Sequence, residues 1–246
     1  MRHARFRDPA GAVRTGVYHG ETVVAADQEY DLADPGVRLL PPCEPEKIVC
    51  VGRNYAAHAA ERDADVPDRP LLFLKPPNTV APPGATTPLP AGKTVEHEAE
   101  LAAVIGTQAR NVTSEAATDY LAGFTCLNDV SNRDDQNREQ NWVRGKAFDG
   151  AAPLGPCVAE PDHVPRDASV ELEVNGNRVQ SGSRERLVFD VPELIAEVTS
   201  YLTLEPGDVI ATGTPAGVGP LSDGDHVGVH VEGVGTLEHD VAREDT

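Results

Sequence analysis

The chain has 246 residues, of which 40 are acidic and 21 are basic, and its formal net charge is −19. A chain this acidic repels phosphate backbones and anionic membrane surfaces, so neither nucleic acid nor a membrane is an expected partner. The sequence contains no run of 18 or more apolar residues and starts without a hydrophobic leader, which predicts a cytoplasmic protein.

Cysteine and lysine usage narrows the possible classes further. The four cysteines form no Cys-x-x-Cys pair, so we expect free thiols and neither a zinc site nor a disulfide framework. Only four basic residues are lysines: Lys47, Lys75, Lys93 and Lys146. This pattern suits a halophilic protein with a hydrated acidic surface, or a GC-rich genome that encodes Arg in place of Lys. Under both interpretations, each lysine is a candidate for a role that Arg cannot fill.

The first part of the chain predicts a small β-rich segment followed by a larger domain. Residues 1–45 carry short apolar stretches with Gly and Asp turns and end in a Pro-containing stretch, which marks a boundary. The main domain is expected over 46–246. It begins with an apolar strand, a Gly turn, a short Ala-rich helix opening near Asn54, and a strand that leads into Pro-rich irregular chain.

The rest of the chain predicts more strands than helices. A strand is expected over 97–107, a short helix over 114–123 capped by Ser114, a strand over 124–131, and then a polar loop or short exposed helix. Asn175-Gly176 predicts the turn of a hairpin, and a helix over 191–202 precedes two closing strands. Many short strands with few helices predict an α+β, β-dominated fold, a mixed β-roll or barrel.

Two carboxylates stand at the head of one apolar run. Residues i and i+2 of a strand share a face, so Glu98 and Glu100 point the same way and need a cation between them or a nearby Arg. Asp129 ends a second expected strand and adds a third carboxylate. Three oxygen ligands without His or Cys suit Mg²⁺ or Mn²⁺. The alternative is chance, because Glu171 and Glu173 repeat the spacing on what we expect to be a solvated face.

A histidine and a carboxylate share one face of the Ala-rich helix. His58 and Glu61 lie three residues apart, which places the two side chains within reach of each other. A His oriented by a carboxylate is a candidate general base near neutral pH. The alternative is an exposed ion pair on a surface helix.

Several segments, in order from about residue 46, resemble the fumarylacetoacetate hydrolase family: IVCVGRNYAAHAAE, LFLKPP, HEAELAAVIG, LNDVSNRDDQ, GKAFD and TLEPGDVIATGTPAGVG. The resemblance is to its short-chain members, which include acylpyruvate hydrolases, oxaloacetate decarboxylases and 2-hydroxyhepta-2,4-diene-1,7-dioate isomerases. It implies a mixed β-roll, a homodimer and Mg²⁺ or Mn²⁺ as cofactor. The implied metal ligands are Glu98, Glu100 and Asp129; the implied catalytic residues are His58, Glu61 and Lys146; and the implied substrate-binding residues are Arg53, Lys75, Arg133, Gln180 and Thr214.

The resemblance also implies a mechanism. A 2-oxo acid chelates the cation, His58 on a lid segment activates water, and C–C cleavage of an acylpyruvate leaves a metal-bound enolate that Lys146 helps to stabilise. Decarboxylation of oxaloacetate passes through the same enolate. An isomerase, a dehydratase of 2-keto-3-deoxy sugar acids and, from another class, a non-catalytic binding module are the alternatives.

Overall fold

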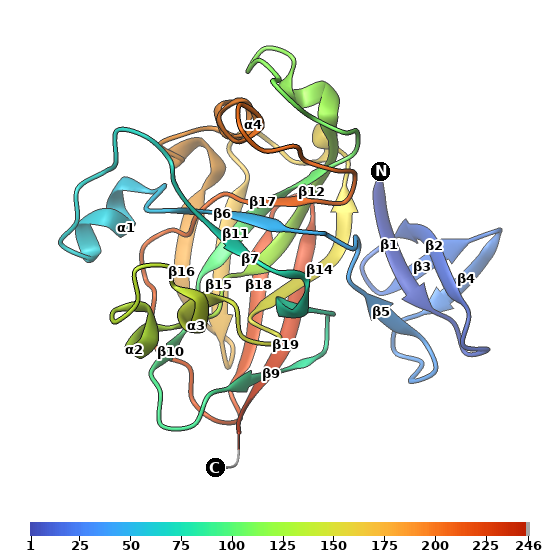
Figure 1. Cartoon of the computed structure of the whole chain (residues 1–246). Coiled ribbons are helices and arrows are strands. Elements are labelled where there is room, and N and C mark those ends of the chain that lie inside the picture. Colours follow the sequence, from blue (N-terminus) through green and yellow to red (C-terminus); the bar gives the residue numbers. More distant parts are fainter. Residues whose placement is uncertain (245–246) are drawn as a thin grey trace.

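The computed structural model describes residues 1–244 and is dominated by β-strands that form two large sheets (Figure 1). The larger sheet has the strand order β4-β3-β2-β1-β14-β12-β11-β17-β6-β7, with β5 paired to β1 and β8 paired to β14. Its main-domain strands are β6 (Ile48–Gly52), β7 (Leu71–Lys75), β8 (Val80–Ala81), β11 (Ala99–Ile105), β12 (Leu121–Asn128), β14 (Ala152–Ala159) and β17 (Val209–Ala211).

The N-terminal strands form a small unit at the side of the main body (Figure 1). They are β1 (Arg2–Arg7), β2 (Val13–Tyr18), β3 (Thr22–Ala25), β4 (Gln28–Asp31) and β5 (Arg38–Leu40). Phe6 packs on Tyr30 with ring centroids 4.8 Å apart. Strand β1 pairs with β14, so the unit continues the main sheet. The predicted β-rich segment is confirmed, and its independence as a domain of residues 1–45 stays a prediction.

The second sheet packs against the first and encloses the apolar core. Its strand order is β16 (Asn177–Ser183), β15 (Ser169–Val174), β18 (His226–Val231), β19 (Gly235–Arg243) and β9 (Thr86–Leu89). Leu172, Val229 and Leu237 of this sheet belong to the same buried cluster as Leu101 and Phe124 of the first. Burial of this continuous apolar face drives the two layers together.

The hairpin predicted at Asn175-Gly176 is confirmed. Strands β15 and β16 pair from Ser169 to Val174, and the two turn residues take φ values of 52° and 77°. Positive φ at both positions is the geometry for which Asn-Gly is favoured.

The helices are few and short: α1 (Ala56–Glu61), α2 (Arg133–Gln136), α3 (Val143–Lys146) and α4 (Val191–Thr199), with 3-10 turns at Pro77–Thr79, Ala117–Tyr120, Pro161–His163 and Arg184–Arg186. Asp190 and Glu193 form a capping box that starts α4. The expected Ser114 cap is wrong, because the 3-10 turn begins after Ala116 and has no side-chain cap. Strand β12 already begins at Leu121, which leaves no room for a longer helix.

The β-dominated class is confirmed. Within residues 1–244 the sheets keep free edges and no closed barrel is found, so the roll or barrel stays a prediction. Over the same residues, every helix is too short or too polar to cross a bilayer. A short pair of strands, β10 (Val95–Glu96) and β13 (Ser131–Asn132), lies beside the ends of β11 and β12.

Candidate active site and metal centre

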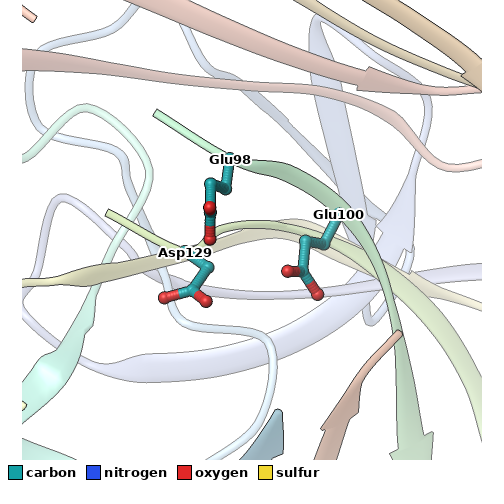
Figure 2. Close-up of side chains that lie close together, drawn as sticks. All are labelled: Glu98, Glu100 and Asp129. Carbon is teal, nitrogen blue, oxygen red and sulfur yellow. The ribbon is translucent and has the colours of Figure 1, made fainter. Parts of the chain in front are cut away.

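Three carboxylates converge at the ends of two neighbouring central strands. Glu98, Glu100 and Asp129 are all buried, and one oxygen from each lies within 4.8 Å of the others (Figure 2). Alternation along β11 explains the first two: Leu101 and Ala103 face the core between the sheets, whereas Glu100 lies on the opposite face. The predicted cluster is confirmed as a geometric feature.

Backbone pairing brings the third carboxylate to the first two. The Asp129 N–H donates to the Glu98 carbonyl oxygen over 2.9 Å, just beyond the last paired residues of β11 and β12. The Glu98 N–H in turn donates to Asn128 Oδ1 at 2.9 Å. These bonds hold the Glu98 and Asp129 carboxylates at one level of the sheet.

The carboxylates differ in their protonation. Burial raises the pKa of Glu100 well above its usual range, and the charges of Asp129 and Glu98 raise it further. Burial acts the same way on Glu98, but Arg133 and Lys146 outweigh it and hold its pKa well below the usual range. The cluster therefore lacks positive charge beside Glu100, where a divalent cation would supply it.

The donor set fits a hard divalent cation. Asp129 Oδ1 is buried without a hydrogen bond, although Lys75 Nζ contacts it at 2.7 Å as an ion pair lacking hydrogen-bond angles. Glu100 is held by a hydrogen bond of 2.7 Å from the Gly213 N–H to its Oε2. Oriented carboxylate oxygens without sulfur or nitrogen ligands are what Mg²⁺ and Mn²⁺ prefer.

Lys146, at the end of α3, carries a positive charge into this cluster. Its Nζ lies 2.7 Å from Glu98 Oε2, 2.6 Å from Asp129 Oδ2 and 2.6 Å from Ser131 Oγ. It also lies 4.8 Å from the centroid of the Phe73 ring. Burial lowers the pKa of Lys146, but the charges of Asp129 and Glu98 outweigh this effect and raise it. The ammonium is therefore held charged and in place.

Two residues expected to bind substrate lie behind the cluster. Lys75 is fully buried, and its Nζ donates to the carbonyl oxygens of Val130 and Ala151 at 3.1 and 2.6 Å. Gln180 is also buried, and its amide donates to Thr214 Oγ1 and accepts from the Ala99 N–H. Neither residue lines the cavity that is lined by His58, Lys146 and the three carboxylates. The geometry favours positioning roles, and direct substrate contact by Lys75 or Gln180 stays a prediction.

His58 on α1 faces the same space from another side. Its ring is buried, and Nδ1 lies 3.4 Å from Glu61 Oε2. Burial lowers the pKa of His58, and the charge of Glu98 and the hydrogen bond with Glu61 oppose the shift only in part. The Gly217 N–H donates to Glu61 Oε1 at 3.0 Å, which ties α1 to a distant loop. His58 is therefore neutral near pH 7, the form required of a general base.

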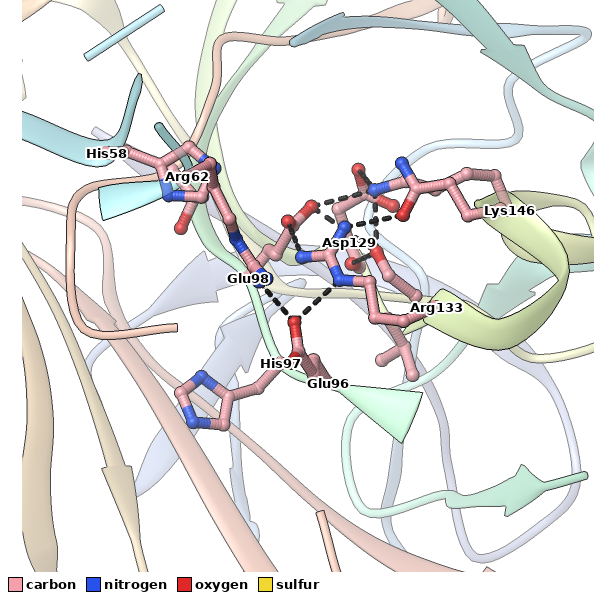
Figure 3. Close-up of polar contacts among 12 residues, drawn as sticks. His58, Arg62, Glu96, His97, Glu98, Asp129, Arg133 and Lys146 are labelled. Carbon is pink, nitrogen blue, oxygen red and sulfur yellow. Dashed lines mark hydrogen bonds and ion pairs between the residues drawn. The ribbon is translucent and has the colours of Figure 1, made fainter. Parts of the chain in front are cut away.

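A chain of charged side chains joins the end of α1 to the carboxylate cluster (Figure 3). Arg62 and Arg133 both pair with the carboxylate of Glu96, and Arg133 also pairs with Glu98. Arg133 Nη1 donates to Gln136 Oε1 at 2.5 Å. This chain holds Arg133 against the wall of the site.

Most of these side chains line one cavity of about 250 Å³. The residues of the sequence hypothesis that line it are Arg53, His58, Glu98, Glu100, Asp129, Arg133, Lys146 and Thr214. Lining residues that the sequence hypothesis missed include Arg62, Phe73, Gln136 and Trp142. Sequence patterns mark these residues only weakly, because Arg62, Gln136 and Trp142 lie in polar or irregular segments whose path depends on tertiary packing.

Comparison with known proteins identifies the family. The family described as Fumarylacetoacetate (FAA) hydrolase C-terminal matches residues 47–242. The solved structure of a 5-carboxymethyl-2-hydroxymuconate delta-isomerase from Mycobacterium smegmatis is 40% identical, with a TM-score of 0.91 and 100% coverage of both chains.

Two curated relatives carry the name oxaloacetate tautomerase. The Bacillus subtilis protein is 36% identical, over 86% of this chain and 75% of its own length. The mitochondrial protein from Homo sapiens is 40% identical, over 81% of this chain and 67% of its own length. The chain belongs to the fumarylacetoacetate hydrolase family, and its relatives include proteins named as tautomerases and isomerases.

Proposed function

We propose that the protein is a divalent-cation-dependent enzyme that interconverts the keto and enol forms of a small 2-oxo acid. The observation that carries the proposal is that His58, a buried neutral base, lines the same cavity as Lys146 and the three carboxylates. The names of the Bacillus subtilis and human relatives support a tautomerase. The small volume of the cavity favours a compact substrate.

Glu98, Glu100 and Asp129 would hold the cation. When bound, the cation supplies positive charge that polarises the 2-oxo group and stabilises the enolate. Lys75 keeps Asp129 oriented from behind through their 2.7 Å contact. Lys146 adds a fixed charge in the cavity, and such preorganised charge lowers the barrier where negative charge develops.

His58 moves the proton. Its neutral imidazole takes a proton from the carbon next to the ketone, the C–H electrons form the new C=C bond, and the carbonyl electrons move to oxygen. Water donates a proton to that oxygen, which completes the enol, and the imidazolium returns a proton to the resulting hydroxide, so His58 is neutral again; the same transfers run backwards in the reverse direction. Glu61 contacts Nδ1 and stabilises the charged ring during the transfer.

A second candidate is hydrolytic C–C cleavage of an acylpyruvate, the reaction favoured by the sequence. The His58 and Glu61 pair favours it as well, because a base oriented by a carboxylate also activates water. Decarboxylation of oxaloacetate is a related reaction, which passes through the same enolate and needs no activated water.

Proton exchange tests the proposal. With Mg²⁺ or Mn²⁺ in D₂O, NMR should show enzyme-dependent loss of the C3 protons of oxaloacetate, faster than any cleavage of acylpyruvates or release of CO₂. His58→Gln should remove this exchange. Rapid acylpyruvate cleavage without faster oxaloacetate exchange would instead support the hydrolase.

A further inference from the structure

Phe73 and Trp142 form an aromatic pair at the wall of the cavity. Their ring centroids lie 5.4 Å apart and their planes meet at 71°, the edge-to-face arrangement that aromatic rings favour. Phe73 belongs to β7, at one edge of the larger sheet, and Trp142 directly precedes α3. The pair therefore joins the sheet to the helical turn that ends at Lys146.

Helix α3 depends on contacts of this kind. It consists of four residues, and a single turn is not stable by itself in water. Trp142 begins the turn, because its carbonyl oxygen accepts the Lys146 N–H at 2.8 Å. The φ of Trp142 is 56°, in the left-handed region, which is unfavourable for a bulky side chain and persists only where surrounding contacts enforce it. The Phe73 ring supplies one of these contacts.

Phe73 also contacts the Lys146 ammonium directly. Nζ lies 4.8 Å from the centroid of the Phe73 ring. The face of an aromatic ring attracts a cation, and this attraction is strongest where water is excluded. Lys146 is 2% exposed, and its Nζ donates hydrogen bonds to two carboxylates and one hydroxyl. The ring therefore constrains Lys146 at the ammonium and, through Trp142, at the backbone.

We propose that Phe73 and Trp142 are positioning residues, which hold the Lys146 ammonium against Glu98 and Asp129. This inference rests on the proposed function, in which Lys146 supplies fixed positive charge where an enolate forms. Such a charge lowers the barrier because it is in place before the reaction begins. With an aliphatic side chain in place of the ring, the ammonium keeps its carboxylate partners but gains a wider range of positions. The rate should therefore fall more than substrate binding.

Phe73→Leu removes the aromatic face and keeps an apolar side chain, whereas Phe73→Tyr keeps the ring. Exchange of the C3 protons of oxaloacetate is followed by NMR in D₂O at saturating Mg²⁺. In Phe73→Leu kcat should be roughly 10-fold lower, with KM within about 2-fold, and Phe73→Tyr should recover most of the rate. Leu74→Ala changes the next residue of β7, which is 53% exposed and does not line the cavity, and it should alter neither constant. An unchanged kcat in Phe73→Leu would overturn the inference.

A double-mutant cycle separates positioning of Lys146 from a general loss of structure. Once Lys146→Ala has removed the ammonium, adding Phe73→Leu should slow exchange by less than about 2-fold. A further loss of about 10-fold in that background would show that the ring acts without Lys146. Urea unfolding of the metal-free proteins gives the same cycle without turnover. Phe73→Leu should lower the unfolding midpoint less in Lys146→Ala than in the wild-type protein, and equal shifts would contradict the inference.

Trp142 reports its own contact, because it is the only tryptophan of the chain. In Phe73→Leu its fluorescence emission should shift to longer wavelength, since the indole loses the ring that packs on it. An unshifted emission maximum would overturn the part of the inference that concerns Trp142. A failure of the proposed function is distinguishable, because the wild-type protein would then show no exchange while emission and urea unfolding still test the contacts.

Discussion

Glu98 and Asp129 meet where β11 and β12 end, joined by the Asp129 N–H and the Glu98 carbonyl oxygen at 2.9 Å. The backbone bond sets both side chains beside Lys146, which contacts a carboxylate oxygen of each. Backbone pairing at the ends of β11 and β12 therefore determines the geometry of the candidate metal site. Sites carried by regular strands are held more rigidly than sites carried by loops.

The variant Glu100→Gln should lose metal binding and keep the stability of the metal-free protein. The pKa of Glu100 is raised by burial and by its acidic neighbours, so a neutral amide replaces a neutral acid in the metal-free protein. Metal-free thermal stability should change by less than about 1 kcal/mol. The stabilisation that Mn²⁺ gives the wild-type protein should disappear.

Calorimetry adds a second readout for Glu100. Because Glu100 must ionise to bind a cation, Mn²⁺ binding should release a proton, and the measured heat should vary with the ionisation enthalpy of the buffer. Binding of Mn²⁺ to Glu100→Gln with unchanged affinity would contradict this assignment.

Lys146→Met should cost both stability and rate. Removing Lys146 takes one cationic partner from each of two buried carboxylates, which costs up to roughly 3 kcal/mol in the metal-free protein because Arg133 still pairs with Glu98 and Lys75 with Asp129. Mn²⁺ should restore part of that loss, because it brings positive charge to the same oxygens. Turnover with metal should fall about 100-fold or more. Urea unfolding with and without Mn²⁺, and turnover at saturating metal, measure the two effects.

His58 should give the reaction an acid limb. Its pKa is lowered from 6.5, chiefly by burial, and the neutral ring is the active base, so kcat/KM should rise with pH through a pKa below 6.5. The charge of Glu98 and the hydrogen bond with Glu61 oppose this lowering of the pKa, and in Glu61→Gln the carboxylate acceptor of that hydrogen bond is lost. The acid limb of the kcat/KM profile should therefore move to still lower pH, and kcat should fall. The Gly217 N–H retains an acceptor in this variant. A limb that does not move would show that Glu61 serves lid closure alone.

His58→Ala distinguishes water activation from a role in substrate closure. If His58 activates water, acylpyruvate hydrolysis should be abolished while oxaloacetate decarboxylation is largely spared, because decarboxylation needs no proton removed from carbon. Assays of both activities at saturating Mg²⁺ measure the difference. Equal loss of both would indicate that the pair serves substrate closure.

Part of the site was predictable from the sequence, because strand periodicity determines which way the side chains of strand residues point. Glu98 and Glu100 share a face because they lie two residues apart, and Asp129 follows a strand that pairs with theirs. The helix with His58 and the Asn175-Gly176 turn likewise follow from local spacing and turn chemistry.

The remainder depends on tertiary packing. Lys75 is on a strand whose alternate residues Leu71 and Phe73 line the cavity, yet its ammonium turns behind Asp129 to reach two carbonyl oxygens. Gln136 and Trp142 reach the cavity from short helical turns that no periodicity marks. Local sequence does not encode such side-chain directions.

His239 predicts acid sensitivity of the fold. It is buried on β19, and Asn128 Nδ2 donates to its Nε2 at 2.9 Å. Burial lowers its pKa from 6.5 to about 4, so the unfolded chain takes up the proton first. Stability should be steady above pH 6.5 and fall by roughly 3 kcal/mol as the pH drops towards 4. Urea unfolding of His239→Gln at pH 7 and 4.5 should show a smaller loss than the wild-type protein, and an equal loss would contradict the assignment.

The most direct test of the central claim is a crystal structure with Mn²⁺ and oxalate, a two-carbon mimic of the 2-oxo acid. Anomalous scattering should place one Mn²⁺ about 2.0 to 2.3 Å from oxygens of Glu98, Glu100 and Asp129. Oxalate should lie in the same cavity as His58 and Lys146. Mn²⁺ bound elsewhere, or oxalate outside this cavity, would contradict the account.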